Sequence, residues 1–301
     1  MHKSRMRKYL PIYLLLVPAF CFTLLFAYVP LFGLIVAFKD YNIFLGFWNS
    51  PWTSQYGFKN IIQIVTDKDL IGSIWNTIKL SLLGMLIGFP APIILALLIN
   101  ELKVGPFKKI TQTISYMPYF LSWISVIGIT LIIFSDYGPL NDFLSMLMPM
   151  RTRQLYLAKQ SLFIPFLLGL SLWKSIGFSS IVYIATISSI DPQLYEAAMI
   201  DGAGRWRQTL HVTLPNLSVI MILLLILSIG GIFSSNFELV FGLKNAFIQF
   251  ETIDTIIYKK GLLQRGYSTA TALGLIRGLI AMGLTLGANR ISVKVNQLSI
   301  I

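Results

Sequence analysis

Long apolar runs, separated by shorter polar segments, dominate the pattern of this chain. A helix needs about 20 mainly apolar residues to cross the hydrocarbon core of a bilayer. Six stretches of the sequence meet that requirement: Leu10–Phe38, Thr77–Ile99, Ile114–Phe134, Leu162–Ile187, Leu217–Ser234 and Thr271–Ile291. The pattern therefore predicts an all-α, polytopic membrane protein with six transmembrane helices.

The first run is the longest, and Pro18 and Pro30 are expected to kink it or to end it early. A cleaved signal peptide is the alternative, because four basic residues precede the run: Lys3, Arg5, Arg7 and Lys8. The apolar stretch is much longer than the about 7–15 residues of a signal-peptide core, and it lacks a cleavage site of small residues. We therefore predict an uncleaved first span.

The composition supports residence in the bilayer. The chain is 55% hydrophobic and 12% charged, whereas soluble domains carry about 25% charged residues. Its net charge of +12 does not indicate nucleic-acid binding, because the basic residues flank the apolar runs instead of forming one basic domain. Basic flanks of this kind contact lipid headgroups at the membrane surface.

The charges also predict an orientation. The basic segment 1–9 indicates a cytoplasmic N-terminus. Six spans then place a transmembrane domain at residues 10–295 and return a short tail, residues 296–301, to the cytoplasm. Lys and Arg are denser in the segments that this arrangement places inside, although their number is similar on both sides. The stretch Asn236–Thr269 is too polar for a full span, and we expect an outer segment there that is partly inserted in the membrane.

Few residues offer reactive or metal-binding chemistry. The single cysteine, Cys21, excludes an intramolecular disulfide and is expected to pack as a small apolar residue. The sequence contains no HExxH or CxxC pattern, so no metal site is predicted. It also lacks the Gly-x-x-x-x-Gly-Lys-[Ser/Thr] pattern of a P-loop, so we expect no enzyme activity and ATP handling by a separate protein.

Residues 190–217, between the fourth and fifth spans, read as a short helix with a defined start and end. Asp191 is suited to cap the helix, and Pro192 suits its first position. Gly202 and Gly204 permit the positive φ that stops a helix. A second short helix is then expected to begin at Arg205.

The surface of this short helix suits contact with another protein. Ala197, Ala198 and Ala203 keep it thin enough to sit in a groove. Glu196 and Asp201 lie about 140° apart around the helix axis, so one carboxylate can face a partner while the other holds the turn. An ordinary capped helix at the membrane surface is the alternative that the residues alone leave open.

The same segment resembles the EAA loop of permease subunits in binding-protein-dependent ABC importers. The matching residues are Glu196, Ala197, Ala198, Asp201, Gly202, Ala203, Leu214 and Pro215, whereas Leu210 and Val212 depart conservatively from the pattern. The resemblance implies the type I ABC importer permease fold, with this loop as a cytoplasmic coupling helix in a cleft of an ATPase subunit. Within this loop we choose Glu196 as the residue that locks it into that cleft, and we count Arg205 with the coupling residues.

Further stretches are similar to the carbohydrate-importing branch of that family, which is related to maltose-type permeases, and to its LplB-like polysaccharide subgroup. These stretches are Met117–Trp123, Trp173–Phe178, Ile181–Ala185, Ile253–Thr255 and Tyr267–Leu275. Together with the loop they cover most of residues 10–295. The resemblance implies a translocation-pore subunit of an ATP-driven importer that passes oligosaccharides from a solute-binding protein into the cytoplasm.

The resemblance implies several partners. They are a second permease subunit, two ATPase subunits that hold ATP and magnesium, and an external solute-binding protein, which the segment Asn236–Thr269 is expected to contact. The complex is expected in a bacterial cytoplasmic membrane, with both termini of this chain in the cytoplasm.

Aromatic and basic residues near the ends of spans are candidates for the substrate path, although aromatic belts at the interface have the same composition. The candidates are Tyr119, Trp123, Trp173, Lys174 and Tyr183, with Tyr116 beside them. Lys174 can bind sugar hydroxyls or a carboxylate, but we favour the interpretation that its side chain reaches to the outer interface. Arg277 is expected to form an internal pair.

Other functions remain open at this point. A permease for a non-sugar solute fits the same motifs. A proton-coupled secondary carrier needs a titratable group within a span, yet His2 and His211 lie outside the predicted spans and no Asp or Glu lies in the middle of one. An intramembrane enzyme is disfavoured, because no nucleophile–base pair is visible.

Overall fold

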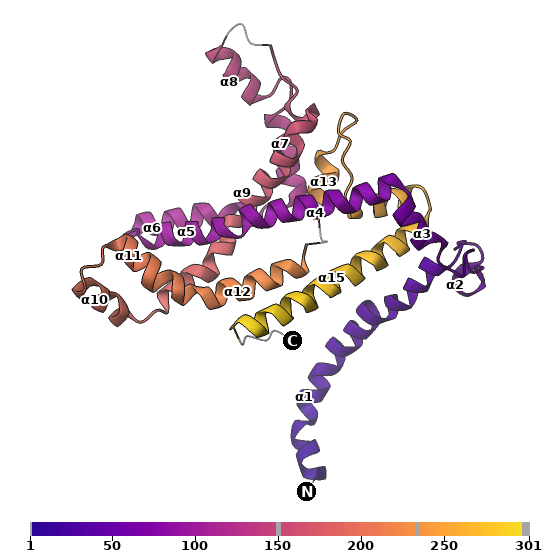
Figure 1. Ribbon diagram of the computed structural model, residues 1–301, viewed down its shortest axis with the longest axis horizontal. Coiled ribbons are helices and arrows are strands. Elements are labelled where there is room, and N and C mark those ends of the chain that lie inside the picture. The colour runs from indigo at the N-terminus through magenta and orange to yellow at the C-terminus, as the bar shows by residue number, and fades with distance from the viewer. Residues whose placement is uncertain (1, 149–151, 233–234, 297–301) are drawn as a thin grey trace. The chain divides into compact units, whose positions relative to one another are not determined.

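The computed structural model describes residues 2–148, 152–232 and 235–296 (Figure 1). Regular structure in these ranges is helical throughout, apart from one isolated antiparallel bridge between Lys39 and Trp52. The expected all-α class is therefore confirmed. The chain divides into two compact units, one of Met1–Ile71 with Ile256–Gly278 and the other of Gly72–Thr255 with Leu279–Ile301.

The first unit begins with a long helical stretch that changes type along its length. The α-helix α1 covers His2–Thr23, the π-helix η1 covers Leu24–Tyr28, and the 3₁₀-helix η2 covers Val29–Phe38. Neither proline ends the helix, because Pro18 is accommodated within α1 and Pro30 lies in the first turn of η2, where no amide donor is needed. Tyr13–Phe38 is long and apolar enough to span a membrane, and its apolar side chains are largely exposed.

The rest of the first unit forms a cap on the segment that follows this span. It contains α2 (Gly46–Asn49), α3 (Lys59–Thr66), η6 (Ile257–Leu263) and the start of α15 (Tyr267–Asn296). The ammonium of Lys39 is buried and donates to the carbonyl oxygens of Phe47 and Trp48, at 3.1 and 2.9 Å. Asn60 donates to the carbonyl oxygen of Ala37 at 2.9 Å, so the end of the span is bound to α3.

The second unit is a bundle arranged around α9. Its elements are α4 (Lys68–Gly88, which starts in the first unit), α5 (Pro90–Asn100), α6 (Pro106–Tyr116), η3 (Met117–Phe120), α7 (Trp123–Ile133), α8 (Pro139–Leu147), η4 (Tyr156–Ala158), α9 (Gln160–Ser188), α10 (Pro192–Ile200), α11 (Arg205–Gln208), η5 (Thr209–Thr213), α12 (Leu214–Gly230), α13 (Phe237–Leu243) and α14 (Ile253–Ile256). The helix α9 packs against α5, α6, η3 and α12.

Two apolar clusters hold α9 in place. At one end, Tyr183 and Ile187 pack with Ile93 of α5 and Leu217 of α12. At the other end, Phe163 and Leu167 pack in a cluster with residues of α7 and α13: Ile127, Leu239, Val240 and Leu243. The described helices bond their backbone groups internally and expose many apolar side chains outward, as a bilayer requires.

Among the described residues, five helices are long and apolar enough to cross a membrane, or up to six if one bent pair counts as a single span. That pair corrects the predicted third span, Ile114–Phe134, which is broken by a bend of 98° between Phe120 and Trp123. The break has a local cause: Leu121 adopts an extended backbone after η3, and the Ser122 hydroxyl caps a new helix by accepting from the Ser125 amide at 3.1 Å.

The other predicted spans correspond to helices with shifted ends. The second is longer than predicted, because α4 and α5 together cover Lys68–Asn100. The fifth helix already starts at Arg205, and the predicted end at Ser234 lies outside the described residues. Most of the predicted tail, residues 297–301, also lies outside them. Residues 236–269 form only the short helices α13, α14 and η6 and the beginning of α15, in agreement with the expectation of no full span there.

Candidate coupling surface and translocation path

The predicted short helix at residues 190–217 is present as α10. Asp191 caps its first turn, and the carboxylate accepts a hydrogen bond from the Gln193 amide at 2.9 Å. Pro192 occupies the first helical position, where its missing amide hydrogen costs nothing. Both features are set by neighbouring residues in the sequence, which is why this start was predictable.

The end of α10 is a Schellman turn. Gly202 has a φ of +75°, the amide of Ala203 donates to the carbonyl oxygen of Ala198 at 2.8 Å, and the Gly202 amide donates to Met199 at 3.0 Å. Gly204 has an ordinary φ of −68° and instead precedes α11, so the expected positive φ holds for Gly202 alone. Arg205 begins α11, as predicted.

The coupling candidates lie on the surface of this hairpin of short helices, next to the start of α12 in Figure 1. Glu196, Ala197, Asp201 and Arg205 are exposed, and Ala198 and Ala203 are half-buried. The Arg205 guanidinium lies 3.3 Å from the Glu101 carboxylate, at the end of α5, in an exposed ion pair. These residues therefore form one accessible surface that a partner can reach.

Two apolar residues on the same surface were missed by sequence reasoning. Ile200 is 86% exposed and Trp206 is 73% exposed, and Met199 beside them is also exposed. Large apolar side chains in a segment between spans are the signal that was available. Together with Glu196 they form what we call the coupling surface, which comprises Glu196, Met199, Ile200, Asp201, Arg205 and Trp206.

The bent third span surrounds Lys174, which lies on α9. The residue is only 9% exposed, and its ammonium donates to the carbonyl oxygen of Tyr119 at 2.6 Å. The same nitrogen lies 5.1 Å from the ring centroids of both Tyr119 and Trp123. The expectation that Lys174 reaches out to the interface is wrong, because the break at Leu121 turns a carbonyl and two rings toward it.

Phe178 extends this cluster by one turn of α9. Its ring stacks on that of Tyr119, with centroids 3.9 Å apart and an angle of 5° between the planes. The structure thus unites three of the predicted path residues, Tyr119, Trp123 and Lys174. Phe178 was not predicted as a site residue, although the spacing of four from Lys174 places it on the same helix face.

A glycine allows α9 to approach the start of this bend closely. A Cβ atom on Gly177 would lie 1.9 Å from the carbonyl oxygen of Ser115, near the end of α6. A larger residue at this position would therefore force the two helices apart.

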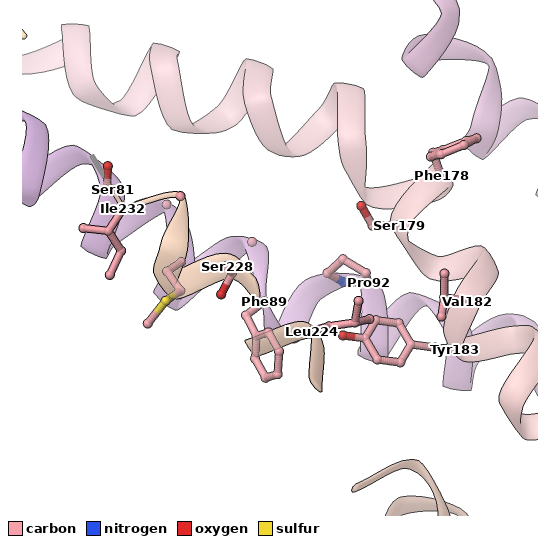
Figure 2. Close-up of a pocket in the computed structure, with 14 residues that line it drawn as sticks. Ser81, Phe89, Pro92, Phe178, Ser179, Val182, Tyr183, Leu224, Ser228 and Ile232 are labelled. Atoms are coloured by element: carbon pink, nitrogen blue, oxygen red, sulfur yellow. The ribbon is translucent and has the colours of Figure 1, made fainter. Parts of the chain in front are cut away.

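A separate cavity of about 530 Å³ opens between α4, α5, α9 and α12. Figure 2 shows Tyr183 and Val182 of α9 near Pro92 of α5 and Leu224 of α12. Its lining is mainly apolar, and the side chains of Ser81, Ser179, Ser228 and Tyr183 add hydroxyl groups. Phe178 lines this cavity as well, and so joins it to the Lys174 cluster.

The remaining predicted residues do not join either group. Trp173 is exposed, and Tyr116 is half-buried at the end of α6. Arg277 is half-buried in α15, and its expected internal pair stays a prediction. In the described residues no group of three or more His, Cys, Asp or Glu side chains is placed to hold a metal ion.

Residues 84–280 match the family described as "Binding-protein-dependent transport system inner membrane component". The chain belongs to this family. The resemblance drawn from the coupling loop is therefore confirmed, and the permease is an inner-membrane subunit of a transport system. The matched range includes the coupling surface and the Lys174 cluster, whereas residues 1–83 lie outside it.

Two relatives from Bacillus subtilis (strain 168) match nearly the whole permease. Protein LplB is 38% identical over 290 residues, which are 95% of this chain and 89% of the relative. The polygalacturonan/rhamnogalacturonan transport system permease protein YteP is 38% identical over 294 residues, which are 97% of this chain and 89% of the relative. The carbohydrate-related part of the resemblance thus has support along the full length of the chain.

Solved structures agree with the fold. A chain of a bacterial ABC transporter involved in the import of the acidic polysaccharide alginate is 34% identical, with a TM-score of 0.88 over 97% of the permease and 98% of that chain. A second structure, of the alginate transporter in complex with an alginate pentasaccharide-bound periplasmic protein, gives a TM-score of 0.89 at 34% identity over 99% of both chains. The permease therefore has the ABC importer permease fold.

Proposed function

We propose that the permease forms half of the translocation pore of an ATP-driven importer, which carries oligosaccharides from a solute-binding protein into the cytoplasm. The observation that carries this proposal is the coupling surface. An exposed carboxylate, Glu196, lies on the capped helix α10 together with exposed Met199 and Ile200, and exposed Trp206 lies on the next helix, α11. Exposed apolar residues rimmed by charges are typical of a protein contact site.

The partner at this surface is, in the proposal, an ATPase subunit that holds ATP and magnesium. ATP binding closes a pair of such subunits, and the coupling surfaces of two permease chains move together with them. The permease then changes between inward-facing and outward-facing states because each ligand favours one state. This requires the coupling surface and, with the proposed six spans, both termini to lie on the cytoplasmic side.

The second element of the proposal is the path of the substrate. The cluster combines the Lys174 ammonium with the rings of Tyr119, Trp123 and Phe178, and a cation beside aromatic rings is the chemistry that binds sugars carrying carboxylates. Tyr183 lines the adjoining cavity. The names of YteP and of the alginate transporter support a saccharide substrate, since these relatives match the whole chain.

A permease for a non-sugar solute is the second candidate. It is favoured by one observation, which is that sn-glycerol-3-phosphate transport system permease protein UgpA of Yersinia enterocolitica is 26% identical over 76% of this chain. The lower identity and coverage make this the weaker of the two.

Reconstitution tests the proposal. The permease is co-expressed with its sister permease, the ATPase and the binding protein, and the complex is placed in proteoliposomes. We expect co-purification of the chains, ATP hydrolysis stimulated by sugar-loaded binding protein, and sugar uptake that needs ATP. Uptake by the permease alone that is driven by a proton gradient would instead establish a secondary carrier.

A further inference from the structure

The first unit contains a polar cleft of about 510 Å³ that the transport mechanism above does not use. Its walls come from residues 40–44 after the first span, from one face of α3, and from residues 265–269 at the start of α15. A volume of this size is that of a small-molecule site. The hydrogen bond from the Tyr41 amide to the Ser268 hydroxyl, at 3.0 Å, joins two of these walls.

Two cations at the cleft are free to bind a ligand. Lys59 and Arg265 line it, both are exposed, and neither side chain has a hydrogen bond or an ion pair among the described residues. The backbone of Arg265 has a φ of +58°, a conformation that residues other than glycine rarely adopt. Two further cations of this unit are in contrast engaged, since Lys260 pairs with Asp67 at 2.6 Å and Lys39 is buried with its ammonium on carbonyl oxygens.

The neutral part of the lining offers hydrogen bonds and aromatic surface. Asn60 is buried and uses its amide nitrogen on backbone carbonyls, so its amide oxygen is left for a ligand. Tyr41 and Tyr267 lie edge to face with ring centroids 5.8 Å apart, and both are half-buried. Asp40 also lines the cleft, and its carboxylate can accept hydrogen bonds from hydroxyl groups.

The combination of cations, a carboxylate, an amide and aromatic rings in the cleft indicates the chemical class of the ligand. A simple polyanion is disfavoured by Asp40, and a neutral sugar leaves Lys59 and Arg265 without a partner. A sugar that carries both hydroxyl groups and a carboxylate uses all of these groups. We propose that the cleft is an outer binding site for a uronate unit of an oligosaccharide, reached before the sugar enters the transmembrane path.

The position of the cleft agrees with this role. It starts directly after the first span ends at Phe38, so a cytoplasmic N-terminus places the cleft on the outer side of the membrane. This step rests on the proposed function, which supplies the orientation and the saccharide substrate. The cleft lies apart from the Lys174 cluster in sequence, and most of its lining lies outside the matched family range.

Binding measurements on the intact transport complex in lipid nanodiscs, without the binding protein, test the proposal. The probes are trigalacturonate and, as a neutral match, maltotriose. We expect Lys59→Gln combined with Arg265→Gln to weaken trigalacturonate binding by about tenfold, because two charge-assisted hydrogen bonds are lost. Maltotriose binding should not change, and Arg265→Lys should retain most of the affinity for trigalacturonate because it keeps the charge.

Lys68→Gln is the matched control, since Lys68 is an exposed cation of the same unit that does not line the cleft. Equal trigalacturonate affinity in the double variant and the unaltered complex would overturn the proposal. It would also be overturned if the double variant lost only its response to the binding protein, because the cleft would then be a protein contact. Failure of the proposed function looks different: the unaltered complex would transport no saccharide at all.

Discussion

The coupling surface and the bend around Lys174 belong to the same unit but are built in opposite ways. In the coupling segment, backbone groups at the helix ends bond to residues nearby in the sequence, as in the hydrogen bond from the Gln193 amide to the Asp191 carboxylate. The side chains of Glu196 and Ile200 are exposed to solvent. At the bend the functional side chain, Lys174, is buried and is bound to a carbonyl 55 residues away along the chain. The side chains of the coupling surface are therefore accessible to a partner protein, whereas Lys174 is packed inside the bundle.

This difference predicts how each region responds to substitution. Changes on the coupling surface should alter function and leave stability unchanged, because the exposed side chains make few internal contacts. Changes at the bend should alter stability, and function only through it or through contact with the substrate. Four experiments test that distinction.

The largest effect is expected for Gly177→Ala. The added Cβ atom would lie 1.9 Å from the Ser115 carbonyl oxygen, so α9 and α6 must separate and the bend must move. We expect a loss of about 3 kcal/mol in the free energy of unfolding, with little assembled complex recovered. Thermal unfolding in detergent and size-exclusion chromatography measure both effects.

Gly169→Ala is the matched control, because Gly169 lies on the same helix and its Cβ would meet nothing within 4 Å. This control should be neutral or slightly stabilising, as alanine favours helix over glycine. If the two variants had the same melting temperature, the tight contact at Gly177 would not hold the bend.

Glu196→Ala should have the next largest effect, and of the opposite kind. We expect sugar transport and sugar-stimulated ATP hydrolysis to fall at least about tenfold, because in the proposed function the ATPase subunit loses a charged contact with the permease. The melting temperature and assembly in the membrane should stay the same, since Glu196 is exposed in the permease itself. Glu196→Gln separates the charge from the size of the side chain. Unchanged stimulated ATPase activity in proteoliposomes would show that Glu196 is not the coupling residue.

The two regions also differ in how far the sequence predicts them. Asp191, Pro192 and Gly202 determine the start and end of α10 through contacts within a few residues, so their order in the sequence was sufficient to predict this helix. The apolar run at Ile114–Phe134 gave no indication of its break, because hydropathy does not register the extended backbone at Leu121. The buried site of Lys174 depends on that break, and so it could not be predicted either.

The polar cleft illustrates the same limit more strongly. Its walls come from residues near 40, near 60 and near 267, and these are brought together only by the fold of the first unit. Individual sequence signals at Lys59 or Arg265 are those of any exposed cation. Long-range assembly thus decides which of the basic residues is available to a ligand.

Lys174→Met tests whether the bend has a function beyond packing. Methionine conserves much of the volume and removes the charge, but it leaves the Tyr119 carbonyl oxygen without its donor, so we expect a loss of about 1–2 kcal/mol in the free energy of unfolding. If Lys174 lies on the substrate path, uptake of an acidic oligosaccharide should fall several-fold. Trp173→Phe, at the exposed neighbour, should leave uptake unchanged. Unchanged uptake by Lys174→Met would leave the residue a packing role alone.

The smallest effect is expected at an ion pair that shares features of both regions. Asp67 and Lys260 of the first unit are distant in sequence, like the contact at the bend, but their side chains remain 24% and 22% exposed. The hydrogen bond from the Lys260 ammonium, together with that from the Asp69 amide, holds the pKa of the Asp67 carboxyl below its usual range. A lowered pKa in the folded state means that the ionised carboxylate stabilises the fold.

That stabilisation is fully present above the ordinary pKa of an aspartate, at about pH 4, and is lost as the pH falls through the lower folded value. Asp67→Asn keeps the helix cap but removes the charge, so it should cost at most about 1 kcal/mol at pH 7 and progressively less below pH 4. Thermal unfolding at pH 7 and at a pH below 4 measures the loss of stability in Asp67→Asn. The control is Asp69→Asn, at an exposed neighbouring residue. An equal cost at both pH values would mean that the pair acts through shape instead of charge, as Gly177 does at the bend.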